Sequence, residues 1–345
     1  MIVEILNEAV SDAHTVKSLV LAGERLRSFV SSNQEVHVAL RSTPVLADII
    51  GDLPDLSAWR TFDHCASLTR LYAVFELFIG KTVRAWLSEM PHVCGNYSSL
   101  GESFNRIHRR GVAQVLMNLD KDRFFYLGRE DRVLDGFLKG VNGDPQYTVL
   151  PEAFLSDTRN LKRDRIEELL SQIKLEGGWD WISRNRFVVT FIEDTRGGQN
   201  TPEAELRSFV NYRNEAAHGS LDQVLGVTPL SEYADFVVAL CKAIDELVRW
   251  NWVRYCKKNG RAKSIGQITE RFKDNIVVAR LHDCSLLKSM DVLLWGKYYC
   301  CTAIIESIRL NDIAYDNLDI DGETEVGLKR NCPSPRHPEL ILIQS

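Results

Sequence analysis

The stretch TPEAELRSFVNYRNEAAHG, residues 201–219, decides the central part of the fold. Thr201 is a preferred helix N-cap, Pro202 suits the first helical position, and the acids that follow stabilise the positive end of the helix dipole. Apolar residues recur at threes and fours: Leu206, Phe209 and Val210. Because Gly219 favours the position just beyond a helix, the stretch predicts an amphipathic helix that ends in a polar cluster.

Similar apolar periodicity surrounds this stretch and predicts further amphipathic helices. They are expected at 66–87, 102–119, 160–175 and 228–255. Pro91 and the Cys-Gly-Asn segment at 94–96 are expected to end the first of them. Residues 186–192 fit either a strand or a helix end.

After the polar linker KKNGR, residues 257–261, the pattern changes to short β-like runs separated by turn residues. The runs are 265–269, 276–279, 292–295, 302–308, 325–328 and 340–343. Strands at this spacing predict a small antiparallel barrel. We therefore expect an α+β multi-domain protein with a helical extension at 1–59, an all-α helical bundle at 60–258 and a β-barrel at 262–345.

Composition limits the function. The net charge of −5 and pI near 6.0 argue against a positively charged coat, so any RNA contact must be local. The eight cysteines include no Cys-x-x-Cys pair, so we expect no metal and no cofactor. An acidic N-terminus and the lack of an apolar run of about 20 residues predict a cytoplasmic protein without membrane contact.

The segment RNEAAHG, residues 213–219, contains the residue types needed to cleave RNA without a metal. His218 can exchange protons near neutral pH, Arg213 can stabilise charge on a phosphate, and Asn214 can orient either group. A structural alternative is open: Arg213 pairs with Glu215 or Asp222, and His218 favours a helix C-terminus.

Helical geometry adds a constraint on this pair. Residues five apart lie about 140° apart around the axis and about 7.5 Å along it. Arg213 and His218 therefore share a site only if the helix distorts or if a two-fold dimer combines both chains.

Four segments together resemble the HEPN superfamily, particularly its RiboL-PSP type. They are RNEAAHG, LRSFVNY at 206–212, SEYADFVVALCKAIDELV at 231–248 and LTRLYAVFELFIGKTV at 68–83. The resemblance implies a dimeric helical bundle that acts as a metal-independent endoribonuclease in toxin or antiviral defence systems. It also implies catalytic roles for Arg213, Asn214 and His218, and for Glu76.

The resemblance does not fix the roles of two positions, 76 and 220. Glu76 could instead be a helix-flank carboxylate that pairs with Arg70 or Lys81. Some members carry a tyrosine two residues after the histidine as the target of a nucleotidyltransferase antitoxin, but this chain has Ser220 there.

Three basic segments, 108–110, 159–165 and 254–263, are typical of solvated helix flanks, and would bind RNA only if they line one cleft.

The C-terminal segments IGQITERFKDNIVVARLHDCSLLKSMDVLLWGK, 265–297, and IIESIRLNDIAYDNLDIDGETEVGLK, 304–329, resemble the second-domain barrel of EF-Tu-type translation factors. This resemblance implies that the barrel brings the nuclease to tRNA or another translation RNA. The other expected partners are a second copy of the chain and an antitoxin or inhibitor protein. The alternative function is a catalytically silent dimeric scaffold that binds a translation component or a protein partner.

Overall fold

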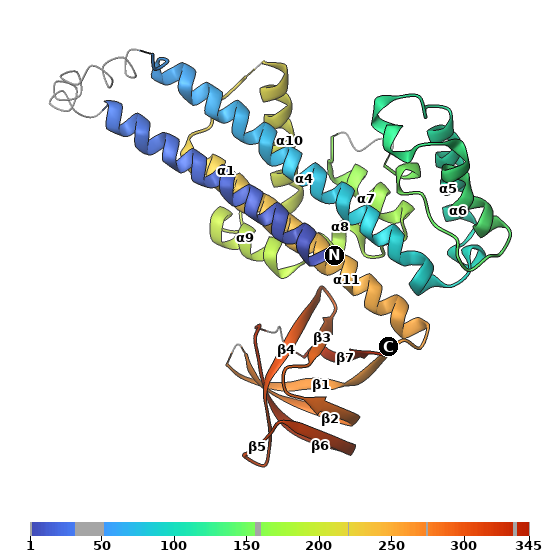
Figure 1. Cartoon of the computed structure of the whole chain (residues 1–345). Helices are drawn as coiled ribbons and strands as arrows, with labels where there is room; N and C mark the ends of the chain where they lie inside the picture. Colours follow the sequence, from blue (N-terminus) through green and yellow to red (C-terminus); the bar gives the residue numbers. More distant parts are fainter. Residues whose placement is uncertain are drawn as a thin grey trace. The chain divides into compact units, whose positions relative to one another are not determined.

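A computed structural model describes residues 2–31, 52–155, 160–219, 221–273, 275–333 and 337–344 (Figure 1). A helical region precedes an antiparallel six-stranded β-barrel, so the predicted fold class is confirmed. The helical elements are α1 (Ile2–Ser31), α4 (Leu56–Cys94), η1 (Tyr97–Leu100), α5 (Glu102–Leu116), η2 (Asp122–Leu127), α6 (Glu130–Val141), η3 (Pro151–Ala153), α7 (Arg163–Gln172), α8 (Gly178–Ser183), α9 (Arg186–Arg196), α10 (Pro202–His218) and α11 (Val227–Lys258). The strands are β1 (Ala262–Lys273), β2 (Ile276–Leu287), β3 (Asp291–Gly296), β4 (Tyr299–Leu310), β5 (Ile313–Tyr315), β6 (Asn317–Arg330) and β7 (Glu339–Ile343).

The chain forms two compact units. The first unit consists of Met1–Ala85, Asp157–Glu168 and Phe187–Lys242, and the second of Trp86–Ser156, Leu169–Arg186 and Ala243–Ser345. In the expected extension 1–59, α1 and the start of α4 are present, and residues 32–51 lie outside the described part.

Several helix boundaries differ from the sequence prediction. α4 begins ten residues before the predicted start, continues through Pro91 and ends at Cys94, within the expected Cys-Gly-Asn segment, so only the stop at Pro91 is wrong. Proline removes one backbone donor, but Met90 and Val93 are buried and hold the last turn in place. Residues 186–192, left open between strand and helix, belong to α9. α7 is shorter than the predicted 160–175.

Aromatic side chains form the centre of the first unit. Tyr72 of α4 contacts Phe209 of α10, with ring centroids 6.1 Å apart, and Phe209 contacts Tyr233 of α11 at 5.5 Å. α1 adds a buried stripe of small residues: Ala9, Ala13, Val16 and Val20. Because these side chains recur at threes and fours, they give α1 one apolar face. α10 therefore packs into the unit through its apolar face, and the C-terminal turn of α10 is exposed to solvent.

The barrel closes because β3, the first strand in the order across the sheet, also pairs with β4 at the other end. The strand order is β3-β7-β1-β2-β6-β4, with β3 also paired to β4, and β5 extends β4 as a short hairpin (Figure 1). Buried apolar residues of the six barrel strands fill the interior. Gly266 of β1 has a φ of 147°, and a Cβ there would lie 2.0 Å from the carbonyl oxygen of Arg280 on β2. Only glycine therefore permits this close strand pairing.

Within the second unit, the end of α11 packs directly on the barrel. Trp250 stacks on Trp295 of β3 at 5.6 Å between ring centroids, and its indole N–H donates to Gly296 O at 2.8 Å. α11 continues through Lys258 and β1 starts at Ala262. Of the segment 257–261, expected as a linker, Lys257 and Lys258 end this helix, and residues 259–261 form the short connection to β1.

Candidate functional site

The candidate site lies at the carboxyl end of α10 in the first unit. The N–H of Ala204 donates to Thr201 Oγ1 at 3.1 Å, which caps the helix start as the sequence predicts. The helix is continuous from Pro202 to His218, and Gly219 follows in the left-handed conformation with a φ of 72°. The expected alternative of a distorted helix at the motif is therefore wrong.

A buried charge cluster fixes the orientation of α10. Arg196 of α9 contacts both carboxylate oxygens of Glu205, at 2.6 Å and 3.0 Å, and also pairs with Glu232 of α11. Glu205 is only 2% exposed, and Asn200 donates a further hydrogen bond to it at 2.6 Å. Bidentate arginine–carboxylate pairs are geometrically specific. The cluster therefore sets the rotation of α10 about its axis, and with it the direction of the motif side chains.

Arg213 is held against an aromatic ring. Its guanidinium carbon lies 4.0 Å from the ring centroid of Tyr72, within cation–π range, and Nη1 donates to Asn214 Oδ1 at 2.9 Å. The hydroxyl of Tyr72 in turn accepts the backbone N–H of Leu161 at 2.8 Å, so the ring is itself fixed. Arg213 is half-buried, which leaves part of its fork accessible. The site thus presents a cation whose direction is set by its neighbours.

Glu76 lies beside this cation. It follows Tyr72 by one helical turn of α4 and is half-buried. Burial raises the pKa of its carboxyl, and the charge of Arg213 opposes that rise. Arg70 and Lys81, the alternative partners expected for Glu76, instead bind acids of α1: Arg70 binds Asp12 at 2.8 Å and Lys81 binds Glu8 at 2.6 Å.

His218 is separate from this cluster within one chain. It is the last residue of α10 and is exposed, and it has no hydrogen-bond or ion-pair partner among the described residues. On a continuous helix its side chain points about 140° away from that of Arg213. The structure therefore brings together Arg213, Asn214 and Glu76, and places His218 at the same helix end on another face.

The family model for the RiboL-PSP-HEPN domain matches residues 47–249, more than half of the 345 residues. The chain belongs to the RiboL-PSP-HEPN family. HEPN domains are often RNases. The matched range contains α10 with its Arg-x4-His motif and ends before the β-barrel. Neither a curated protein nor a solved structure gives a match.

Sequence reasoning missed Tyr72 of this HEPN site and the buried His64 on the same helix. Tyr72 supports Arg213, and His64 lies two turns earlier on the same face of α4, edge-on to Tyr212 at 6.3 Å. His64 is fully buried and accepts the N–H of Leu225 at Nδ1, so its proton is on Nε2, and burial lowers its pKa. The available signal was the four-residue spacing of 64, 68, 72 and 76, which aligns these positions along one helix face.

Several residues of the three basic segments of the HEPN chain are buried or bound in ion pairs. His108 is fully buried. Arg163 pairs with Glu203 at 3.1 Å and Arg165 with Glu168 at 2.6 Å, while Arg159 lies outside the described residues. Lys257 binds Glu339 at 2.8 Å. These ion pairs are typical of helix flanks, whereas the burial of His108 contradicts a solvated position for that residue.

The described ranges contain no cluster of three histidine, cysteine or acidic side chains that could hold a metal ion. In the same ranges, no helix combines the length and apolar character needed to span a lipid bilayer. Ser220, which replaces the modifiable tyrosine of some HEPN proteins, lies outside the described part of the chain.

Proposed function

We propose that this HEPN protein is an endoribonuclease that cleaves RNA without a metal ion, using Arg213 and His218 of two chains in one shared cleft. The observation that carries the proposal is the end of α10. There, Arg213 lies over the ring of Tyr72 and beside Glu76, and the exposed His218, which has no partner among the described residues, ends the helix. A polar pair of this kind at the surface, beside a cation with a fixed direction, suits phosphate chemistry.

Cleavage proceeds by attack of a 2′-hydroxyl on the adjacent phosphorus, with departure of the 5′-oxygen. The attacking hydroxyl must lose a proton to a base, and the leaving oxygen must gain one from an acid. One chain offers a single His218 at the motif, whereas a two-fold dimer offers two, one for each role. Arg213 stabilises the charge on the non-bridging oxygens, and Asn214 holds its guanidinium by accepting its hydrogen bond.

Cleavage of RNA in the presence of EDTA tests the assignment. Arg213→Ala and His218→Ala are each expected to lower the rate at least 100-fold with little loss of stability, because neither side chain lies in the core. Asn214→Ala should have a milder effect. Matched controls are Arg207→Ala, an exposed arginine on the same helix, and His14→Ala, an exposed histidine on α1. Wild-type rates in either motif variant would contradict the assignment.

A mixed dimer tests the shared cleft. We would purify a wild-type and His218→Ala pair through two different affinity tags. If the two His218 side chains act as base and acid of one reaction, this pair should retain far less than half of the wild-type rate. A rate near half would show that each chain works alone, and a protein that is active as a monomer would exclude the shared cleft.

For the substrate we propose tRNA or another structured translation RNA. Support comes from the resemblance of the barrel to that of EF-Tu-type translation factors, since a docking domain raises local RNA concentration without a strongly basic surface. Cuts are expected in single-stranded loops, where the 2′-oxygen can align with the phosphate. Mapping of new RNA 5′ ends after expression of wild type and His218→Ala tests this. Cuts scattered over mRNA coding regions would contradict it.

The proposed setting is a toxin or antiviral defence system, with an antitoxin or inhibitor protein as the restraining partner. The alternative function is a silent scaffold, in which the helical domain only dimerises and the barrel binds a protein or a translation component. Absence of cleavage for wild type under all conditions, together with a stable dimer, would favour the scaffold.

A further inference from the structure

Two cysteines of the second unit lie within reaction distance of each other. Cys301 is on β4 and Cys332 follows the end of β6 by two residues, and their Sγ atoms are 3.6 Å apart. The pairing of Ile305 with Arg330 in the β4–β6 ladder brings the two segments together. Both thiols are half-buried, and both are reduced in this structure.

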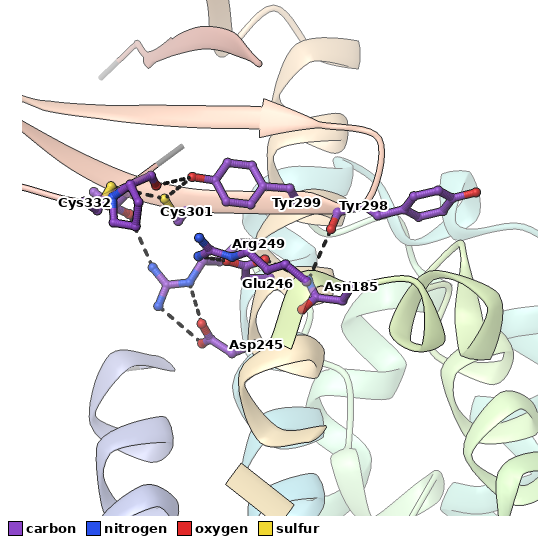
Figure 2. A network of polar contacts seen from close by, with 11 residues as sticks. Asn185, Asp245, Glu246, Arg249, Tyr298, Tyr299, Cys301 and Cys332 are labelled. Carbon is purple, nitrogen blue, oxygen red and sulfur yellow. Dashed lines mark hydrogen bonds and ion pairs between the residues drawn. The ribbon is translucent and has the colours of Figure 1, made fainter. Parts of the chain in front are cut away.

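Cationic and hydroxyl groups surround this pair. Arg330 is fully buried, and none of its three guanidinium nitrogens has a hydrogen-bond partner among the described residues. Arginine remains charged even when buried, so an unpaired guanidinium strongly favours an anion nearby. The Tyr299 hydroxyl lies 3.0 Å from Cys301 Sγ and 3.2 Å from Pro333 O. Figure 2 shows Tyr299, Cys301 and Cys332 gathered above the side chains of α11.

The two thiols have different environments. The hydrogen bond from Cys301 and the charges of Arg330 and Arg186 lower the pKa of Cys332 to about 7. The same hydrogen bond, together with burial, raises the pKa of Cys301. Cys332 is therefore the nucleophilic member of the pair, and Cys301 is the thiol that keeps its proton.

We propose that Cys301 and Cys332 form an oxidisable dithiol site, in which Cys332 reacts with a peroxide and Cys301 then closes a reversible disulfide. The Cys332 thiolate attacks one peroxide oxygen, the O–O bond breaks, and the departing oxygen takes up a proton and leaves as water. The Cys301 sulfur then attacks the sulfenic sulfur of Cys332 and displaces its oxygen as a second water. Two thiols and one hydrogen peroxide thus give one disulfide and two waters.

The geometry favours closure of this bond. The Sγ atoms must approach from 3.6 Å to about 2.05 Å. Cys332 lies beyond the last paired residue of β6, so that side of the pair can move without breaking the ladder. Burial raises the pKa of Cys284, which lies on β2 of the same barrel, so this cysteine serves as the reference thiol.

The site borders the contact between the barrel and α11 in the second unit. Arg249 of α11 donates to Thr302, the neighbour of Cys301, at 3.3 Å and pairs with Asp245 at 2.9 Å. Asn185 donates to Glu246 at 2.8 Å and to Tyr298 O at 3.2 Å (Figure 2). Oxidation is therefore expected to alter the stability of this contact, which a thermal melt can detect.

The test uses the reduced full-length protein treated with hydrogen peroxide and then analysed by mass spectrometry of the intact chain and its peptides. The expected result is loss of two hydrogens, a cross-linked peptide pair that contains Cys301 and Cys332, and full reversal by dithiothreitol. In alkylation with iodoacetamide, Cys332 should react faster than Cys284 at pH 7. Cys284→Ser is the matched control and should oxidise like wild type.

Variants separate the two roles. Cys301→Ser should leave Cys332 as a sulfenic acid that a dimedone probe traps, whereas Cys332→Ser should give neither product. The proposal is overturned if wild type shows no 301–332 cross-link, if other cysteines cross-link as readily, or if Cys332 is alkylated no faster than Cys284. Because each of these is measured on wild type, the result does not depend on the folding of a variant.

Discussion

His108 is predicted to make the stability of the chain depend on pH. Its side chain is fully buried in the second unit, where the N–H of Leu150 donates to Nε2 at 3.0 Å. The proton is therefore on Nδ1, which lies 2.9 Å from the hydroxyl oxygen of Tyr97. Burial lowers the pKa of His108 to about 4. Folding therefore favours the neutral imidazole.

The sign and size of the effect follow from this difference in pKa. The unfolded chain binds a proton at His108 below about pH 6.5, whereas the folded chain resists protonation until about pH 4. The neutral His108 therefore contributes its full share to the stability of the folded chain above about pH 6.5, and this contribution is lost as the pH falls toward 4. Proton linkage gives a loss of about 2 kcal/mol by pH 5 and about 3 kcal/mol by pH 4.

Urea unfolding followed by tryptophan fluorescence measures this loss at pH 7.5 and pH 5. When the pH is lowered from 7.5 to 5, the free energy of unfolding of wild type should fall by about 2 kcal/mol more than that of His108→Gln, which cannot titrate. Because each protein is compared with itself at the two pH values, the part of the substitution's effect on stability that does not depend on pH cancels. His92→Gln, an exposed histidine of the same unit, should behave like wild type. Equal pH dependence in wild type and His108→Gln would refute the reasoning.

Three further substitutions test the structure around the site and the barrel by urea unfolding. Thr201→Ala removes the N-cap of α10 and should cost about 1 kcal/mol, while Thr201→Ser should cost little. Tyr72→Phe leaves the N–H of Leu161 without its acceptor and should cost about 1–3 kcal/mol, with the stacking on Arg213 retained. Gly266→Ala should be the most damaging, at more than about 2 kcal/mol, because its Cβ would meet backbone of β2 and its φ disfavours alanine. A Gly266→Ala protein as stable as wild type would contradict the described strand pairing.

The sequence predicts the fold class because its signals are local. The cap at Thr201, the apolar spacing in α10 and the alternation in the barrel each act within a few residues. The length of α4 was not predictable in the same way, since tertiary contacts of Met90 and Val93 outweigh the helix-breaking tendency of Pro91. Tertiary packing therefore carries the helix past Pro91, and the local signal at 94–96 then ends it as predicted.

The candidate site was predictable in part. The motif itself gave Arg213, Asn214 and His218 as candidates, because their residue types suit the proposed chemistry, and the family resemblance added Glu76. The proximity of Glu76 and Tyr72 to Arg213 depends on packing of α4 against α10, which no local pattern records. The same limit applies to Cys301 and Cys332, which approach through the pairing of β4 with β6.

The most direct test of the central claim is the chemistry of the RNA ends that purified wild-type protein produces in EDTA. The proposed mechanism predicts 5′-hydroxyl ends and 2′,3′-cyclic phosphates, because the 2′-oxygen is the nucleophile. Both products should disappear with His218→Ala and persist with His14→Ala. Ends that carry a 5′-phosphate, or cleavage that EDTA abolishes, would contradict the account.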